Sequence, residues 1–204
     1  MTDDLISDNK FASFRHSLAS VISMAKSNFA DRNLELEMRM NVEMTDFYET
    51  FQSISSFTLT KQEATHNVLV IDDSDVRRLR SEYTAADVPI FIRSVAKSRL
   101  RPPIDIVYSC GKMRIDLQEE IVTDQIVSNG NHFRKRERCS FVFDDCPAWR
   151  VDYSRVIEDQ RILQPSFEIE VELLPEALAV ILSDEALRIV VDQAVVIWQR
   201  IGIN

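Results

Sequence analysis

Glutamate and apolar side chains alternate strictly over residues 167–173, and this pattern constrains the fold of the chain more than any other. Successive side chains of a β-strand point to opposite faces, so Glu168, Glu170 and Glu172 would share one face of such a strand. A row of carboxylates repels itself unless cations lie opposite it, and the other face is fully apolar. We therefore predict a strand whose apolar face is covered by protein and whose acidic face lines a polar interior. The alternative is a surface strand of a half-buried antiparallel sheet, which alternates in the same way.

A second copy of this pattern occupies residues 34–40, where Glu35 and Glu37 share a face with Arg39. Two such strands can be neighbours in an antiparallel sheet, and their carboxylates would then face one space. Hard divalent cations prefer carboxylate oxygens as ligands. The paired pattern therefore predicts a cation site between the two strands, built from Glu35, Glu37, Glu168, Glu170 and Glu172.

Basic residues alternate in the segments that lie between the two acidic ones. They are Arg78 with Arg80, Lys97 with Arg99, the series Arg134, Arg136 and Arg138, and Arg150 with Asp152 and Ser154. About eight strands with polar inner faces, bracketed by helices, indicate a mainly β fold: a closed eight-stranded antiparallel barrel with a hydrophilic interior. We predict a single domain over residues 1–204, with the barrel over about 32–174 and outer helices over about 9–30 and 176–200. Such an interior suits a polyanion that is held by arginine and lysine and bridged to the carboxylates by a metal ion.

The composition excludes several classes of protein. With only three glycines among 204 residues, the chain has no glycine-rich phosphate loop, so side chains would have to hold any bound phosphate. A net charge of −9 argues against a surface that coats nucleic acid, although it allows a local basic site. Three scattered histidines suggest no zinc site, and three cysteines without a close pair predict reduced thiols in an intracellular protein. We find no signal peptide and no apolar run of membrane-spanning length, so we expect neither secretion nor a membrane partner.

Four motifs, taken in order, resemble those of a known enzyme family. They are Glu35-x-Glu37, Arg134-x-Arg136-x-Arg138-x-Ser140, Arg150-Val151-Asp152-x-Ser154 and Glu168-x-Glu170-x-Glu172. In this order they resemble the divalent-cation-dependent RNA 5′-triphosphatases, the beta subunit of mRNA capping enzyme in fungi, protozoa and some large DNA viruses, within the triphosphate tunnel metalloenzymes. The resemblance implies an eight-stranded tunnel and dependence on Mg²⁺ or Mn²⁺. The implied reaction is removal of the γ-phosphate from the 5′-triphosphate end of nascent mRNA, the first step of cap formation.

The same resemblance implies a role for each matching position. Glu120 would orient or deprotonate the attacking water, and Arg136 and Ser154 stand where lysine and threonine are usual in the family. The implied metal ligands are Glu35, Glu37 and Glu172, and Glu168 and Glu170 would support the metal site. The implied phosphate contacts are Arg80, Lys97, Arg134, Arg136 and Arg138. The implied structural supports are Arg150, Asp152 and Ser154.

The resemblance also implies substrates, partners and a location. Triphosphate-ended RNA and nucleoside triphosphates would be substrates, an RNA guanylyltransferase is a candidate partner, and a homodimer is left open. The protein would be nuclear in a cell, or cytoplasmic if it came from a large DNA virus. Three alternatives remain: a tunnel enzyme for tripolyphosphate or thiamine triphosphate, a non-catalytic capping subunit, and an unrelated β-rich binding module. The three-glutamate strand and the Arg-Val-Asp-x-Ser strand favour the RNA enzyme over the tripolyphosphate enzyme.

Overall fold

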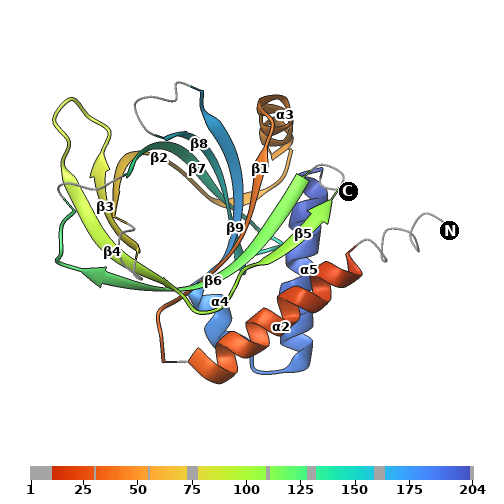
Figure 1. The fold of residues 1–204 in the computed structure, drawn as a ribbon. Helices are drawn as coiled ribbons and strands as arrows, with labels where there is room; N and C mark the ends of the chain where they lie inside the picture. The colour runs from red at the N-terminus through yellow and green to blue at the C-terminus, as the bar shows by residue number, and fades with distance from the viewer. Residues whose placement is uncertain are drawn as a thin grey trace.

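A computed structural model describes residues 11–29, 31–54, 56–72, 78–108, 111–127, 132–158 and 164–202. Within these residues, nine antiparallel strands form one sheet that curls into a barrel, seen end-on in Figure 1. The strands are β1 (Leu34–Val42), β2 (Leu59–Asp72), β3 (Arg78–Thr84), β4 (Phe91–Arg99), β5 (Ile104–Tyr108), β6 (Gly111–Thr123), β7 (His132–Phe143), β8 (Trp149–Glu158) and β9 (Ser166–Leu173). The helices are α2 (Ala12–Phe29), α3 (Met44–Ile54), α4 (Pro175–Val180) and α5 (Asp184–Arg200).

Eight of these strands close the barrel in the order β1-β9-β8-β7-β2-β3-β4-β6, and pairing of β6 with β1 completes the ring. This confirms the predicted eight-stranded antiparallel barrel. The ninth strand, β5, follows β4 along one edge of β6 and lies outside the ring. The sequence alone suggests separate short strands at 58–63 and 66–71, but these residues form one strand, β2, which pairs with β7 along almost its whole length.

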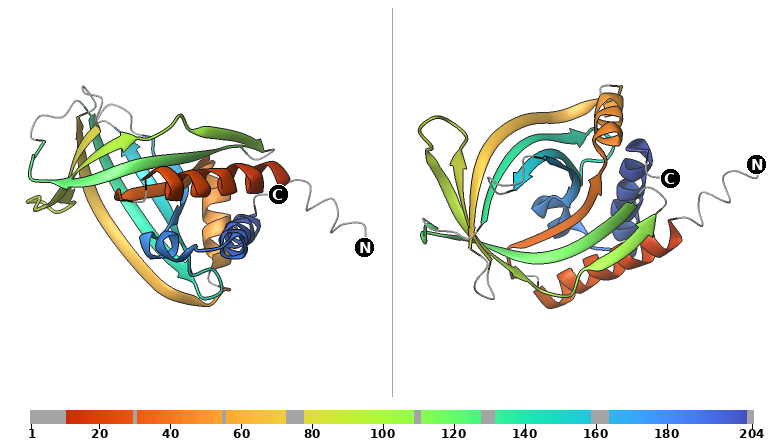
Figure 2. Two further views of the ribbon diagram at one scale, coloured as in Figure 1. Left: turned by 90° about the horizontal axis from the view of Figure 1, so that it is seen from below. Right: turned by 45° about the horizontal axis from the view of Figure 1, so that its top comes forward.

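The terminal helices lie outside the barrel, as the sequence predicts. Helix α2 occupies most of the predicted range 9–30, of which residues 9, 10 and 30 lie outside the described part, and it contacts α5, β1 and β6. Figure 2 shows α2 running beneath β5 and β6 on the same side of the barrel as α5. Helix α5 begins after Ser183, whose hydroxyl accepts a hydrogen bond from the backbone N–H of Ala186 at 3.1 Å. None of the described helices has the length and apolarity needed to cross a membrane.

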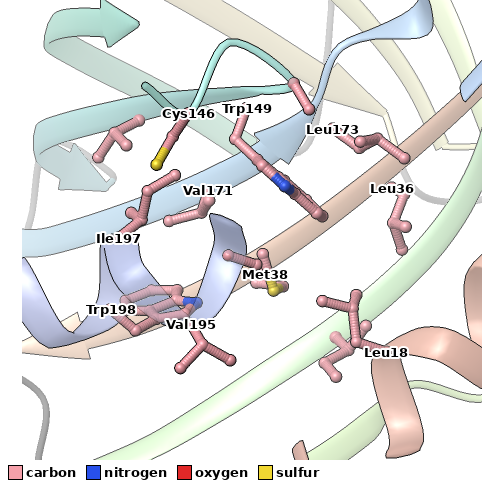
Figure 3. Close-up of a cluster of buried hydrophobic side chains, with 14 of the residues drawn as sticks. Leu18, Leu36, Met38, Cys146, Trp149, Val171, Leu173, Val195, Ile197 and Trp198 are labelled. Atoms are coloured by element: carbon pink, nitrogen blue, oxygen red, sulfur yellow. The ribbon is translucent and has the colours of Figure 1, made fainter. Parts of the chain in front are cut away.

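The main hydrophobic core lies between the outer face of the barrel and these helices. Met38 of β1 and Val171 of β9 point out of the barrel toward Val195, Ile197 and the Trp198 ring of α5 (Figure 3). Burial of such side chains contributes about 1.5–3 kcal/mol each. Because side chains alternate along a strand, the same packing turns Glu35, Glu37 and the other polar residues of β1 and β9 into the barrel. The core therefore fixes which face of each acidic strand is the inner one.

The two tryptophans of this core allow a paired test of one hydrogen bond. Both rings are fully buried, but the Trp149 indole N–H donates to the Val190 carbonyl at 2.8 Å, whereas the Trp198 indole nitrogen has no hydrogen-bond partner among the described residues. Trp149→Phe should lower the free energy of unfolding by about 1–3 kcal/mol more than Trp198→Phe, because the first change removes a buried hydrogen bond and the second removes a buried N–H group that has no partner among the described residues. Denaturant unfolding of both variants measures the difference, and equal losses would contradict the assignment.

Candidate active site in the barrel lumen

The lumen of the barrel holds two cavities of about 250 and 280 Å³, which share Glu37, Arg39, Arg80, Lys97 and Arg134 as lining residues. They are therefore two halves of one enclosed space. Eight basic and five acidic side chains line the first half, so this space is positively charged although the whole chain carries a net charge of −9. The lining residues of this half are Asn33, Leu34, Glu35, Glu37, Arg39, Arg80, Arg93, Lys97, Glu120, Arg134, Arg136, Arg138, Arg150, Glu170, Glu172 and Pro175. Of the predicted site residues, all but Glu168, Asp152 and Ser154 are among them.

The two acidic strands are neighbours, as the sequence predicts, and their register brings the carboxylates together. Glu37 of β1 lies directly opposite Glu172 of β9, and Arg39 lies opposite Glu170. Glu35 is two residues before Glu37 and so faces the lumen from the same strand. Strands β1 and β9 thus form one acidic wall of the lumen, with Arg39 set among the glutamates.

The electrostatics of this wall are uneven. Burial raises the pKa of Glu37, and the nearby Glu170 and Glu35 raise it further. Burial likewise raises the pKa of Glu172 to about 7, with Glu35 adding to the effect. Glu170 behaves oppositely: burial opposes its ionisation, but Arg39 and other arginines outweigh burial and hold its pKa below the usual range. The barrel therefore disfavours the ionised forms of Glu37 and Glu172, and a cation bound beside them would stabilise those forms.

The predicted metal ligands suit a divalent cation in type and place, but their side chains are engaged elsewhere. Glu35 is paired with Lys97, Glu172 with Arg150, and Glu37 with Arg39, whose Nη2 lies 3.0 Å from the Glu37 Oε1. In the described part of the chain, no three acidic, histidine or cysteine side chains gather closely enough to hold a metal ion as they stand. Carboxylates on adjacent strands are nevertheless the donors that Mg²⁺ and Mn²⁺ take. Binding of such an ion requires Glu35 and Glu172 to turn away from their cationic partners.

Glu120 of β6 faces the acidic wall from within a group of cations. Its Oε2 lies 3.1 Å from the Lys97 Nζ and 3.9 Å from the Arg80 Nη2, and its Oε1 lies 3.5 Å from the Arg93 Nη1. Burial opposes ionisation of Glu120, but Lys97, Arg80 and Arg93 together hold its pKa below the ordinary value. The carboxylate is therefore charged at neutral pH and well suited to accept hydrogen bonds from water. The lowered pKa makes it a weak base.

A basic wall, formed mainly by β7, lies on the other side of β8 from the acidic wall. Arg134, Arg136 and Arg138 line the lumen together with Arg80 of β3. Burial, together with the neighbouring charges of Arg138 and Arg80, lowers the pKa of Arg136 to about 10. The Nε atoms of Arg80, Arg136 and Arg138 are buried without a hydrogen-bond partner among the described residues. Crowded guanidinium groups with buried unpaired donors are the chemistry that binds phosphate oxygens.

Three predicted support residues lie outside the cavity lining, and their contacts differ. Asp152 is 1% exposed and accepts hydrogen bonds from the Arg138 Nη1 at 3.2 Å and the Arg150 Nε at 3.1 Å. Glu168 is buried and paired with Arg134. The hydroxyl of Ser154 is buried with no hydrogen-bond partner in the described part of the chain, so the structure gives Ser154 no visible supporting contact.

The sequence places Arg39 on the face of Glu35 and Glu37 without predicting a role for it, and it does not single out Arg93. Arg39 contacts both Glu37 and Glu170, and Arg93 donates a hydrogen bond from its Nε to Glu82 at 3.1 Å. Alternation could have found Arg93, because it lies four residues before Lys97 on the same face of β4. Alternation could also have placed Glu82, a buried acid of β3, because it lies two residues after Arg80.

No protein-family model and no curated protein matches the sequence. Solved structures do match: the chain superposes on the Schizosaccharomyces pombe Pct1 RNA triphosphatase with a TM-score of 0.73 and 10% identity, covering 94% of this chain and 93% of that one. It has the fold of an RNA triphosphatase. The mimivirus capping enzyme triphosphatase agrees, with a TM-score of 0.66 and 16% identity over 92% of this chain and 97% of that one.

The shared fold does not by itself assign a reaction. A chain of the Schizosaccharomyces pombe Mediator head module also superposes, with a TM-score of 0.52 and 12% identity over 83% of this chain and 94% of that one. Because one fold can host different functions, the assignment has to come from the side chains of the lumen.

Proposed function

We propose that this protein is an RNA 5′-triphosphatase that removes the γ-phosphate from the triphosphate end of RNA. The observation that carries the proposal is the lumen itself, an enclosed space lined both by glutamates of β1 and β9 and by arginines of β7. An anionic chain end enters such a space because its positive charges exceed its negative ones. A deep, narrow lumen also favours a terminal phosphate over a phosphate in the middle of a strand.

The side chains divide the work of phosphoryl transfer, which needs mainly positioning and electrostatic stabilisation. Arg136, Arg138 and Arg80 would bind the phosphate oxygens through the Nε donors that have no partner among the residues the structure describes. Lys97 and Arg134 would contribute further positive charge to the same space. Glu120 would hold the attacking water in line with the bond that breaks, and the RNA would leave with a diphosphate end.

We further propose that Mg²⁺ or Mn²⁺ is required and is held by Glu35, Glu37 and Glu172. A divalent cation in such a site supplies charge neutralisation at the phosphoryl oxygens. Turning of Glu35 toward the ion would leave Lys97 without that partner, and turning of Glu172 would do the same for Arg150. Both cations would then be available to the phosphates.

A role in mRNA capping follows from the proposed reaction, because a diphosphate end is what a guanylyltransferase modifies. One structurally similar Pct1 chain was solved in complex with the Spt5 CTD, and the mimivirus triphosphatase is a domain of a trifunctional mRNA capping enzyme. We therefore propose a guanylyltransferase as a partner in the same process.

The test compares release of phosphate from triphosphate-ended RNA, ATP and tripolyphosphate in the presence of Mn²⁺ and in EDTA. We expect release from the γ position, the highest kcat/KM for RNA, and no release in EDTA. Release from tripolyphosphate alone would favour the alternative tunnel enzyme, and no release from any of the three would refute a triphosphatase.

A further inference from the structure

A groove on the outside of the barrel joins one mouth of the lumen. It is a cavity of about 330 Å³ between the C-terminal part of α2 and helix α4, and it shares Asn33, Leu34 and Pro175 with the lining of the lumen. Figure 1 shows α4 beside the C-terminal end of α2, next to the barrel. A molecule bound in the lumen could therefore extend into this groove over these three residues.

The rim between lumen and groove is held to the proposed catalytic strand. The Asn33 side-chain amide donates to the Glu120 carbonyl oxygen at 2.8 Å, and the Glu120 backbone N–H donates to the Asn33 carbonyl at 2.9 Å. These two bonds keep the beginning of β1 against β6. The groove thus begins at a fixed position next to the half of the lumen that holds Glu120, Glu35 and Glu172.

The groove combines cations with an apolar floor. Lys26 and Arg32 line it, together with the apolar residues Ala25, Leu178 and Ala179. The Arg32 side chain is 46% exposed and has one acidic neighbour, Glu119, at 3.2 Å. No acidic side chain of the described residues forms an ion pair with Lys26. A groove lined by cations is suited to follow the phosphate backbone of a single-stranded nucleic acid.

The opposite mouth of the lumen is also basic, but Arg99, Arg114 and Lys112 there are paired with acids. Arg99 pairs with Asp116 at 2.8 Å, and Asp105 pairs with Arg114 at 3.0 Å and with Lys112 at 2.6 Å. Phosphates entering there would have to compete with Asp105 and Asp116 for these cations. The mouth beside α2 and α4 is therefore the better exit for a polyanion whose end lies in the lumen.

We propose that the RNA leaves the lumen past Asn33 and Pro175 and lies in this groove, where Lys26 and Arg32 bind the phosphates of the nucleotides after the first. The inference rests on the proposed function, and it adds a binding site for the body of the substrate. It explains how the enzyme would discriminate RNA from free triphosphates, because ATP ends before it reaches the groove.

The test measures binding of a fluorescent 12-nucleotide RNA with a 5′-diphosphate end, a product that is not hydrolysed further. The double variant Lys26→Ala/Arg32→Ala should bind this RNA with a Kd about tenfold higher than that of the wild-type protein, after correction for any change in the KM for ATP. The slope of log Kd against log salt concentration should also fall by about 1.4, because each phosphate contact to a single strand contributes about 0.7. A merely structural role of the two residues would not change the salt slope.

The matched control is Arg101→Ala/Lys112→Ala, which removes one arginine and one lysine near the opposite mouth and should leave RNA binding unchanged. An unchanged Kd in Lys26→Ala/Arg32→Ala, or a larger loss in the control, would overturn the inference.

Hydrolysis of ATP by the wild-type protein distinguishes failure of the groove from failure of the proposed function. If ATP is hydrolysed and the groove variant binds RNA normally, only the inference fails; if nothing is hydrolysed, the proposed function fails.

Discussion

Glu172→Gln is expected to lower the rate of γ-phosphate release by about a thousandfold, because loss of a metal ligand forfeits several kcal/mol of transition-state stabilisation. The same result is expected for Glu35→Gln. The measurement is kcat for triphosphate-ended RNA in saturating Mn²⁺. Glutamine keeps the shape of the side chain and removes only the charge, so the change isolates the carboxylate.

The protein should remain folded in the Glu172→Gln variant. Burial raises the pKa of Glu172 to about 7, which means that the folded barrel disfavours the charged form of this side chain at neutral pH. A neutral amide in this position should therefore cost little in the free energy of unfolding. Glu176→Gln, an exposed acid on α4 four residues later, is the matched control and should leave kcat unchanged. Full activity of Glu172→Gln in saturating Mn²⁺ would show that Glu172 is not a ligand.

Asp152→Ala, unlike Glu172→Gln, should destabilise the barrel. We expect a loss of about 3–5 kcal/mol, because the change leaves two partly buried arginines without their shared carboxylate. Asp152 is 1% exposed and lies within 3.2 Å of both Arg138 and Arg150. Removal of one member of a buried ion network costs far more than the network contributes as a whole, because the remaining charges stay buried. Denaturant unfolding measures the loss directly.

Asp145→Ala is the surface counterpart of this substitution. Asp145 pairs with Arg200, but its side chain is 61% exposed, and exposed pairs contribute about 0–1 kcal/mol. Asp152→Ala should therefore lose several times more stability than Asp145→Ala. Similar losses for the two variants would mean that the Asp152 network does not brace β7 and β8.

The strand alternation predicted the acidic wall well because one physical constraint determines it. With Ile169 and Val171 in the core against α5, the glutamates of β9 can only face inward, and the same holds for β1. The basic strands followed from the same period of two. The closed barrel could then be inferred from the number of such strands, because an interior of charged side chains needs walls on every side.

Other features depend on contacts that sequence patterns do not carry. Residues 63–66 show no apolar alternation, so the sequence suggested a break in what is one strand, β2, held along its length by hydrogen bonds to β7. The pairing of Glu82 with Arg93 and Arg136 joins three strands that are distant in sequence. Glu35 pairs with Lys97 and Glu172 with Arg150. Several cations lie near each glutamate, and the side-chain rotamer decides which one it contacts, so strand alternation cannot predict these pairs.

Binding of Mn²⁺ to the full chain, measured by electron paramagnetic resonance of the free ion, tests the central claim most directly. The account predicts about one tightly bound Mn²⁺ per chain, since the three carboxylates offer a single oxygen-rich site. It also predicts that the double variant Glu35→Gln/Glu172→Gln binds none at the same concentrations. Absence of binding to the wild-type protein, or unchanged binding to the double variant, would contradict a metal site on the wall formed by β1 and β9.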